Sequence, residues 1–229
     1  MNLFSRILRR IRRTIKINQR RRQAQRLGLR SIPPNYIFFE RFSPDSVIVD
    51  AGCSYEAELS RHMMGAYGAR AFGVDPTRKH ADALHALEQE SGGCFTYIQA
   101  AIAAQEGALT FNESLTNESG SIFNDHYNMR NFESRSYEVE ALSLPGLMQR
   151  LGVPQVDLLK LDLEGAEYDL LNAVSAADLA PFRQIFVEFH HNAVPHLTPA
   201  DTQARVHRLE SLGLRSFSLD DVNYLFYRD

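Results

Sequence analysis

A short apolar segment that ends in acidic residues constrains the fold more than any other part of the sequence. Residues 158–163 read Leu-Leu-Lys-Leu-Asp-Leu, and Gly165 follows too closely for a long helix, so the segment predicts a buried strand. Asp162, Glu164 and Glu167 lie where this strand should give way to a helix. In an open parallel sheet, ligands bind at the carboxyl ends of the strands, so we expect these acids to lie at a binding site.

The same pattern of strand followed by helix recurs along the chain. The strands predicted besides this one are residues 46–51, 71–75, 94–99, 183–189, 214–219 and 222–227. Helical segments separate the first three, and right-handed crossovers then predict a doubly wound parallel sheet. Only two residues separate the last two strands, so these form an antiparallel hairpin. The predicted fold class is α/β, with a seven-stranded, mostly parallel sheet, a reversed last strand and helices on both faces.

Residues 100–142 do not follow this alternation of strands and helices. Extra strands are predicted at 108–112 and 137–142, and a polar loop lies between them. A loop of this length in a compact body is usually functional or disordered. We assign the region to substrate capture, with plain disorder as the alternative.

The first 30 residues differ in charge from the rest of the chain. They hold eleven of the 25 basic residues and no acid, which leaves 14 bases against 28 acids in the other 199 residues. Apolar residues repeat every three or four positions, at Leu3, Phe4, Ile7, Leu8, Ile11 and Ile15. This pattern predicts a basic amphipathic helix that can contact an anionic membrane. The alternatives are a transit peptide and a solvated tail that packs on its own body.

Two prolines in Ser31–Pro34 mark a predicted boundary, because neither continues a helix or joins a strand ladder. We therefore divide the chain into a basic arm, residues 1–32, and a catalytic body, residues 33–229. The arm lacks the interleaved aromatic residues that stack on bases, so no nucleic-acid partner is expected. Cys53 and Cys94 lack CxxC spacing and a secretory leader, which favours free thiols and a cytoplasmic protein, peripheral at the inner face of the membrane if the arm binds there.

The turn after the first predicted strand of the body discriminates between cofactors. A dinucleotide site needs a glycine-rich G-x-G-x-x-G turn, whereas this turn reads Asp50-Ala51-Gly52-Cys53-Ser54 and places an acid where a pyrophosphate would lie. This argues against NAD-dependent oxidoreduction. An adenosyl sulfonium ligand carries a cation and no phosphate. Asp50 near its amino-acid tail, Gly52 allowing close approach and Asp75 accepting the ribose hydroxyls make a consistent set.

The sequence resembles the FkbM family of class I S-adenosylmethionine-dependent methyltransferases. The resemblance covers roughly residues 46–191 and rests on four blocks: Asp50-Ala-Gly52, Asp75-Pro76, Lys160-Leu-Asp162-Leu-Glu164-Gly165-Ala-Glu167 and Phe186-Val-Glu188-Phe-His190. It implies a Rossmann-like fold and O-methylation of a hydroxyl on a sugar, glycan, lipid or related metabolite. The cofactor residues expected are Asp50, Gly52, Ser54, Asp75, Pro76, Ala101 and Asp162. Glu56 departs from the family, whose loop usually has glycine there, and Ser54 stands where asparagine is frequent.

Transfer to a hydroxyl requires a group that takes its proton. We expect His190 or Glu188 to be this base, with Asp162 close to the sulfonium and the methyl group. Asp162, Glu164 and Glu188 also permit Mg²⁺, but the spacing is unspecific and a metal is not favoured. The alternative for His190 and its neighbour His191 is a structural loop pair bonded to backbone. The rival function is a catalytically weak cofactor-binding module attached peripherally to a membrane.

Overall fold

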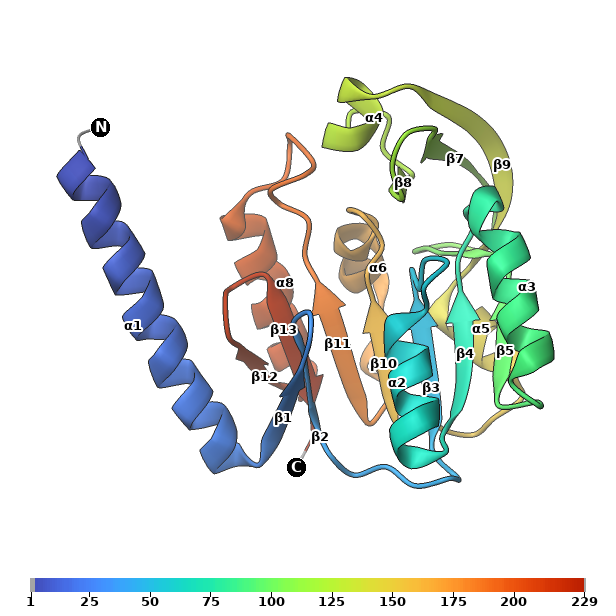
Figure 1. Ribbon diagram of the computed structural model, residues 1–229, viewed down its shortest axis with the longest axis horizontal. Coiled ribbons are helices and arrows are strands. Elements are labelled where there is room, and N and C mark those ends of the chain that lie inside the picture. Colours follow the sequence, from blue (N-terminus) through green and yellow to red (C-terminus); the bar gives the residue numbers. More distant parts are fainter. Residues whose placement is uncertain (1–2, 229) are drawn as a thin grey trace.

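A seven-stranded sheet forms the centre of the molecule in the computed structural model, which describes residues 3–228, with side chains from Thr14 onward. Its strand order is β12-β13-β11-β10-β3-β4-β5 (Figure 1). The strands are β3 (Val47–Ala51), β4 (Arg70–Val74), β5 (Phe95–Ile98), β10 (Leu158–Leu161), β11 (Gln184–Glu188), β12 (Arg215–Ser218) and β13 (Asn223–Tyr227). Strands β11, β10, β3, β4 and β5 are parallel, and β13 runs antiparallel to both β11 and β12. The expected α/β fold with a seven-stranded sheet is confirmed.

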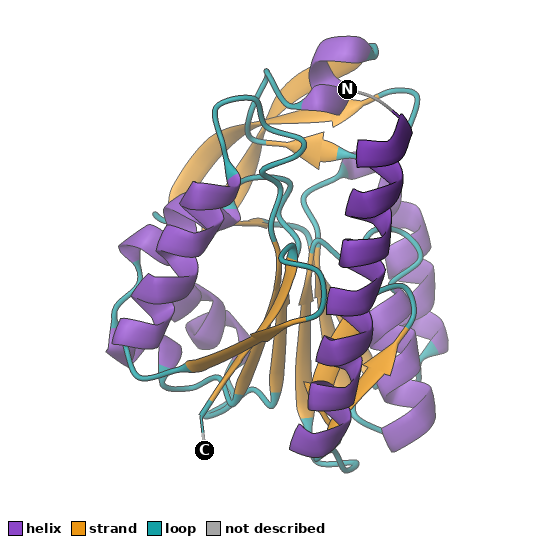
Figure 2. Ribbon diagram, turned by 90° about the vertical axis from the view of Figure 1, so that its left-hand side faces the viewer, coloured by secondary structure: helices purple, strands orange, loops and turns teal. Residues whose placement is uncertain are grey.

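Helices cover both faces of this sheet (Figure 2). One face carries α2 (Glu58–Tyr67), the short 3-10 helix η1 (Arg78–His80) and α3 (Ala81–Glu90), and the other carries α5 (Leu144–Leu151), α6 (Glu167–Ala173), α7 (Ala176–Leu179) and α8 (Pro199–Ser211). The sequence sets several helix ends. Gly68 and Gly152 adopt left-handed conformations that end α2 and α5. Thr198 and Asp201 form a capping box at the start of α8.

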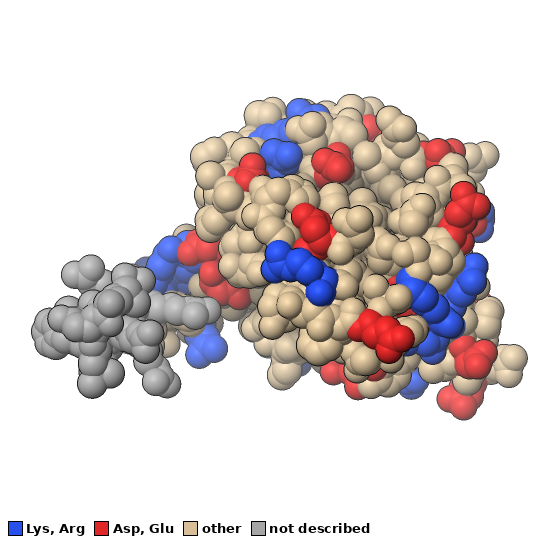
Figure 3. All heavy atoms as spheres, turned by 90° about the horizontal axis from the view of Figure 1, so that it is seen from above, with Lys and Arg blue, Asp and Glu red and all other residues tan. Residues whose placement is uncertain are grey.

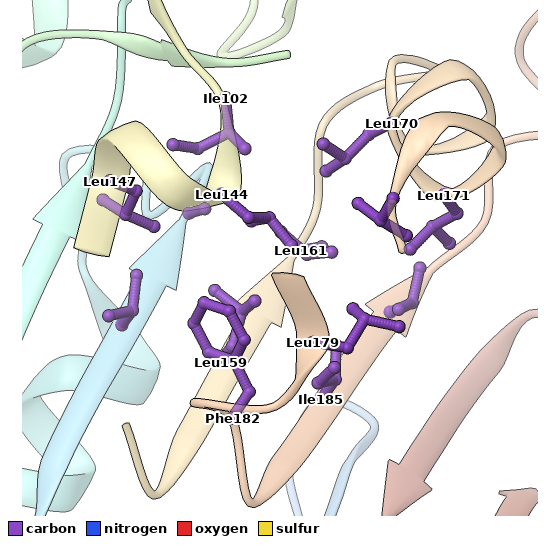
Figure 4. Close-up of a cluster of buried hydrophobic side chains, with 14 of the residues drawn as sticks. Ile102, Leu144, Leu147, Leu159, Leu161, Leu170, Leu171, Leu179, Phe182 and Ile185 are labelled. Carbon is purple, nitrogen blue, oxygen red and sulfur yellow. The ribbon is translucent and has the colours of Figure 1, made fainter. Parts of the chain in front are cut away.

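The core lies on both sides of the central strands, because successive side chains of a strand point to opposite faces. Leu159 and Leu161 of β10 pack with α5, α6 and α7 in the cluster of Figure 4, which also contains Ile185 of β11. Leu158 belongs to the second cluster, on the face covered by α2 and α3. Burial on both faces explains why these strands read as nearly continuous apolar runs.

A hairpin that the sequence did not indicate lies across the predicted boundary at residue 32. Its strands β1 (Leu29–Ile32) and β2 (Tyr36–Phe39) pair antiparallel. Gln184 of β11 bonds both backbone groups of Phe39, at 2.7 and 3.2 Å, and the Tyr36 ring lies 5.4 Å from that of Phe186. The arm and the body are therefore continuous here. Pro33 and Pro34 lie in the hairpin turn, where no ladder hydrogen bond is needed.

Helix α1 (Leu3–Leu27) precedes the hairpin and stands beside the body (Figure 1). On the face of the body that Figure 3 shows, basic and acidic side chains are interspersed. Lys16 and Arg20 each approach Asp221 to 2.6 Å, and Ala24 is buried. Most other side chains from Thr14 to Leu27 are exposed. The apolar residues predicted to line this helix lie, apart from Ile15, outside the described side chains. No helix in the described part of the chain is long and apolar enough to cross a membrane.

The region between residues 100 and 142 folds as a second sheet above the carboxyl ends of the main strands (Figure 1). Its order is β6-β9-β7-β8. The elements are β6 (Ala101–Ile102), β7 (Gly107–Ser114), β8 (Gly120–Ser121), α4 (Tyr127–Asn131) and β9 (Ser134–Leu142). Strands β7 and β9 pair along their whole length, so both are longer than the sequence indicates. The predicted polar loop contains β8 and α4, and we call residues 100–142 the insert.

Candidate functional site

The turn after β3 crosses directly over the end of β10. Gly52 has a φ of +74°, and a Cβ at this position would lie 1.8 Å from the carbonyl oxygen of Asp162. Only glycine fits such a contact. We expected Gly52 to allow a ligand to approach, and the structure shows that it is first needed to bring two strand ends together.

A cavity opens at the carboxyl ends of β3, β4 and β10, beneath the insert. The space between atoms that it outlines, open solvent included, is about 730 Å³. Six of the seven predicted cofactor residues line it: Gly52, Ser54, Asp75, Pro76, Ala101 and Asp162. Glu118 of the insert and Glu164 add two more carboxylates. Among the described residues that line the cavity, His80 is the one basic side chain and four are carboxylates, so its wall favours a cation over a phosphate.

Asp50, the seventh predicted residue, does not line the cavity. It is 1% exposed, and its carboxylate accepts hydrogen bonds from the backbone N–H and hydroxyl of Ser60. Lys160 Nζ lies 3.2 Å from both Asp50 and Asp162 and donates to the carbonyl oxygen of Gly52 at 2.6 Å. Burial alone would lower the pKa of Lys160, but Asp162 and Asp50 outweigh it and hold this pKa above its usual range. Lys160 therefore joins the ends of β3 and β10 as a buried cation.

Asp75 shapes the side of the cavity formed by β4. Its carboxylate accepts the backbone N–H groups of Ser54 and Thr77, both at 2.8 Å, and lies 3.4 Å from His80 Nδ1. Burial alone would raise the pKa of Asp75, but the hydrogen bonds from His80 and Thr77 lower it below its usual value. The other nitrogen of His80 lies 3.0 Å from Glu118. Asp75 is thus an ionised acceptor at the cavity wall.

His190 lies behind Asp162 and is surrounded by carboxylates. Its Nδ1 is 3.0 Å from Glu167, and its Nε2 is 3.3 Å from Asp162 and 3.7 Å from Glu164. Burial alone would lower the pKa of His190, but Glu167 and the other acids raise it well above the usual value. Both ring nitrogens therefore hold protons at neutral pH. An imidazolium has no free lone pair with which to accept a proton, and this one contacts Asp162 directly.

Glu188, at the end of β11, is the titratable member of this group. Its carboxylate has no hydrogen bond or ion pair with any residue that the structure describes. Burial, followed by repulsion from Asp162, raises the pKa of Glu188 to about 7. Neither Glu188 nor His190 lines the cavity itself. His190 contacts the wall residue Asp162, and the charge of Asp162 acts on Glu188.

The turn after β10 is held by the insert. Glu164 has a φ of +51°, in the left-handed region, and its carbonyl oxygen accepts a hydrogen bond from Ser121 Oγ at 2.7 Å. His126 Nε2 lies 2.9 Å from the carboxylate of Glu164. Phe123 packs closely on Gly165, because a Cβ added to Gly165 would lie about 3.0 Å from the Phe123 ring. The insert thus fixes one wall of the cavity and orients Glu164.

Several of these residues were not predicted as site residues. Lys160 carried a signal, because it is the one basic residue inside an otherwise apolar strand. Glu118 and Ser121 carried no such sequence signal. They lie in the polar stretch of the insert, whose fold the sequence did not reveal. Cys53, in the turn after β3, is buried, and burial raises the pKa of its thiol well above the usual value, so it is a poor nucleophile.

Within the described residues, no group of three or more His, Cys, Asp or Glu side chains is placed to hold a metal ion. This includes the set of Asp162, Glu164 and Glu188 that the spacing allowed. Asp162 is instead paired with Lys160 and His190, and Glu164 with His126.

Comparisons with known proteins place the sequence in a family. Residues 23–216 match the model of the methyltransferase FkbM domain. The comparison with curated proteins gives no significant match. Similar solved structures include the fibrillarin pre-rRNA processing protein of Methanococcus jannaschii, with 11% identity over 88% of this chain and 70% of that one and a TM-score of 0.49. The precorrin-6y C5,15-methyltransferase of Geobacter metallireducens has 10% identity over 95% and 87%, with a TM-score of 0.45. Similarities this weak carry no conclusion about the chain.

Proposed function

The chain belongs to the FkbM methyltransferase family, and from this premise we propose that it transfers a methyl group to a hydroxyl of a sugar, glycan, lipid or related acceptor. The resemblance that the motifs indicated is thereby confirmed, and S-adenosylmethionine is the cofactor of the family. The single observation that carries the proposal is the cavity wall. It combines four carboxylates with no lysine or arginine among the described residues, as a cationic ligand without phosphate requires.

The residues present fit this cofactor. Asp75 is an ionised acceptor suited to ribose hydroxyls, and Asp162 and Glu164 supply negative charge on the opposite wall. Burial alone would raise the pKa of Asp162, but Lys160 and His190 outweigh it and hold this pKa well below its usual range. Asp162 is therefore ionised at all physiological pH values. S-adenosylmethionine supplies a methyl group that its positive sulfur has already activated.

Glu188 is the residue best suited to take the proton of the acceptor hydroxyl. A general base works best when its pKa lies near the working pH, and burial places the pKa of Glu188 at about 7. His190 is disfavoured in this role, because Glu167 and Asp162 keep both its nitrogens protonated. We assign His190 to positioning: it holds Asp162, which in turn lies beside Lys160. The remaining acceleration comes from orienting the acceptor.

The experiment that tests this function compares binding with turnover. Titration calorimetry should show S-adenosylmethionine binding to the wild type, and a panel of sugars, glycans and lipids with free hydroxyls should reveal methyl transfer. Glu188→Gln should keep cofactor binding and lower the transfer rate about 10²–10⁴-fold, which is the usual contribution of a general base. No binding, or a rate unchanged in this variant, would contradict the proposal.

Glu56 is the feature that favours the rival function, a catalytically weak cofactor-binding module. Its side chain is exposed, Tyr55 donates a hydrogen bond to it at 3.1 Å, and it does not line the cavity. The departure from glycine therefore lies outside the cavity wall. Cofactor binding without transfer to any member of the panel would favour the rival function.

We also propose peripheral contact with an anionic membrane through residues 1–30. The support is structural: α1 is a continuous helix whose described bases Arg21, Arg22 and Arg26 are exposed. Each base near an anionic surface adds about 1 kcal/mol of attraction. A membrane-bound enzyme would meet lipid-linked acceptors at that surface.

A further inference from the structure

Asn223, the first residue of β13, has a buried oxygen without a partner. The residue is 3% exposed, and its amide N–H group donates to Asp220 at 2.9 Å, which fixes the orientation of the amide. The amide oxygen Oδ1 is then left without a hydrogen-bond donor in the described structure. A buried acceptor without a donor is costly, so a native structure that keeps one calls for an explanation.

Glu188 belongs to the strand that pairs with β13. In the antiparallel pair β11–β13, Glu188 is the partner of Asn223. Residues paired in this way carry their side chains on the same face of the sheet, with Cβ atoms about 4.5–5.5 Å apart. An ionised Glu188 can only accept hydrogen bonds and would repel the amide oxygen, whereas a protonated Glu188 has one O–H to donate.

We propose that Asn223 is a positioning residue for the general base: in the cofactor-free protein Glu188 is protonated and donates to Asn223 Oδ1, and binding of a cationic cofactor releases this proton to solvent. The first half of this inference is the hydrogen bond from Glu188 to Asn223, and it does not depend on the proposed function. The second half is the release of the proton on cofactor binding, and it rests on the proposed function. The hydrogen bond explains both the unpaired amide oxygen and the absence of any other partner for the Glu188 carboxylate. The base would then be more fully ionised when the methyl donor is bound.

The charges around Glu188 are arranged so that a bound cation would lower its pKa. Asp162 and Glu164 raise the pKa of Glu188, while His190 and Lys160 lower it, and burial makes the largest contribution. Asp220 adds a further negative charge behind Asn223. A positive ligand against the wall formed by Asp162 and Glu164 offsets the repulsion that favours the acid form. S-adenosylhomocysteine, whose sulfur is neutral, lacks that charge.

Carbon-13 NMR of protein labelled at glutamate carboxyl carbons tests the first half without any cofactor. The resonance that Glu188→Gln removes should titrate with a midpoint near 7 in the wild type. Asn223→Leu removes the acceptor and should lower this midpoint by about 0.5–1 unit, the contribution of one neutral hydrogen bond. Gln184→Leu is the matched control, because it removes another buried amide from β11 and should leave the midpoint unchanged. An unshifted midpoint in Asn223→Leu would overturn the assignment.

Titration of the same resonance with cofactor tests the second half. Saturating S-adenosylmethionine should lower the Glu188 midpoint by about one unit or more, and S-adenosylhomocysteine should lower it less. Calorimetry in buffers of different ionisation enthalpy should show proton release that Glu188→Gln abolishes. Binding without a change in midpoint or proton count refutes the coupling alone, whereas no binding refutes the proposed function and leaves the NMR result for Asn223 standing.

Discussion

Lys160 connects three parts of the site through one ammonium group, which bonds the carbonyl of Gly52 and lies between Asp50 and Asp162. Removing one partner of a buried ionic group leaves the other charges unpaired, at a cost of about 3–5 kcal/mol. We expect Lys160→Met to lower the free energy of unfolding by about that amount in urea denaturation. The double variant Lys160→Met/Asp50→Asn should recover part of the loss, because it removes the more deeply buried acid as well. Unchanged stability of the single variant would contradict this account of the charges.

Glu188 should make stability depend on pH. Its pKa is about 7 in the folded protein against an ordinary 4.5, so the folded state binds the proton more tightly. The contribution of Glu188 to the free energy of unfolding is therefore fully present below pH 4.5. It falls as the pH rises to about 7, by at most about 3 kcal/mol. Glu188→Gln should become more stable than the wild type toward pH 8, while the exposed Glu138→Gln should not. Parallel curves for wild type and Glu188→Gln in thermal denaturation at several pH values would disprove the shift.

The insert acts at the scale of elements, because its sheet holds the turn after β10. Ser121→Ala removes the hydrogen bond to the Glu164 carbonyl, whereas Ser136→Ala removes a bond within the insert, to Asn112 at 2.8 Å. Each should cost about 1 kcal/mol of stability. Only Ser121→Ala should also weaken S-adenosylmethionine binding, by about threefold to tenfold in calorimetry, since Glu164 lines the cavity. Equal affinities in the two variants would show that the insert does not position the cofactor wall.

The elements that the sequence predicted are those with local signals. Apolar runs that stop at an acid placed Asp75 and Asp162 at the ends of the two strands that flank β3, and six of seven expected cofactor residues line one cavity. The hairpin β1–β2 was missed because Pro33 and Pro34 read as a boundary, while its stability comes from contacts with β11 that are remote in sequence. Asn223 could not be found either. Its importance depends on the register that places it opposite Glu188, and no local pattern encodes register.

At the scale of the whole molecule, the described side chains of α1 meet the acidic body at the buried Ala24 and through ion pairs to Asp221. The arm carries eleven bases, while the rest of the chain has 14 bases and 28 acids. In the described structure, Asp221 is 42% exposed at its side chain and pairs with Lys16 and Arg20. Exposed ion pairs of this kind contribute about 0–1 kcal/mol, so α1 can exchange the acidic body for another anionic surface.

Asp221→Asn removes the carboxylate that pairs with Lys16 and Arg20, so both cations become available to an anionic membrane. We expect the wild type to co-sediment with vesicles containing phosphatidylglycerol and not with phosphatidylcholine alone, and the variant to bind more strongly with an unchanged melting temperature. Binding should fall in 1 M salt, where the screening length shrinks to about 3 Å. Deletion of residues 1–30 is the control. Co-sedimentation that survives this deletion would assign membrane contact to the body, and variant binding equal to the wild type would mean that the body does not compete for the arm.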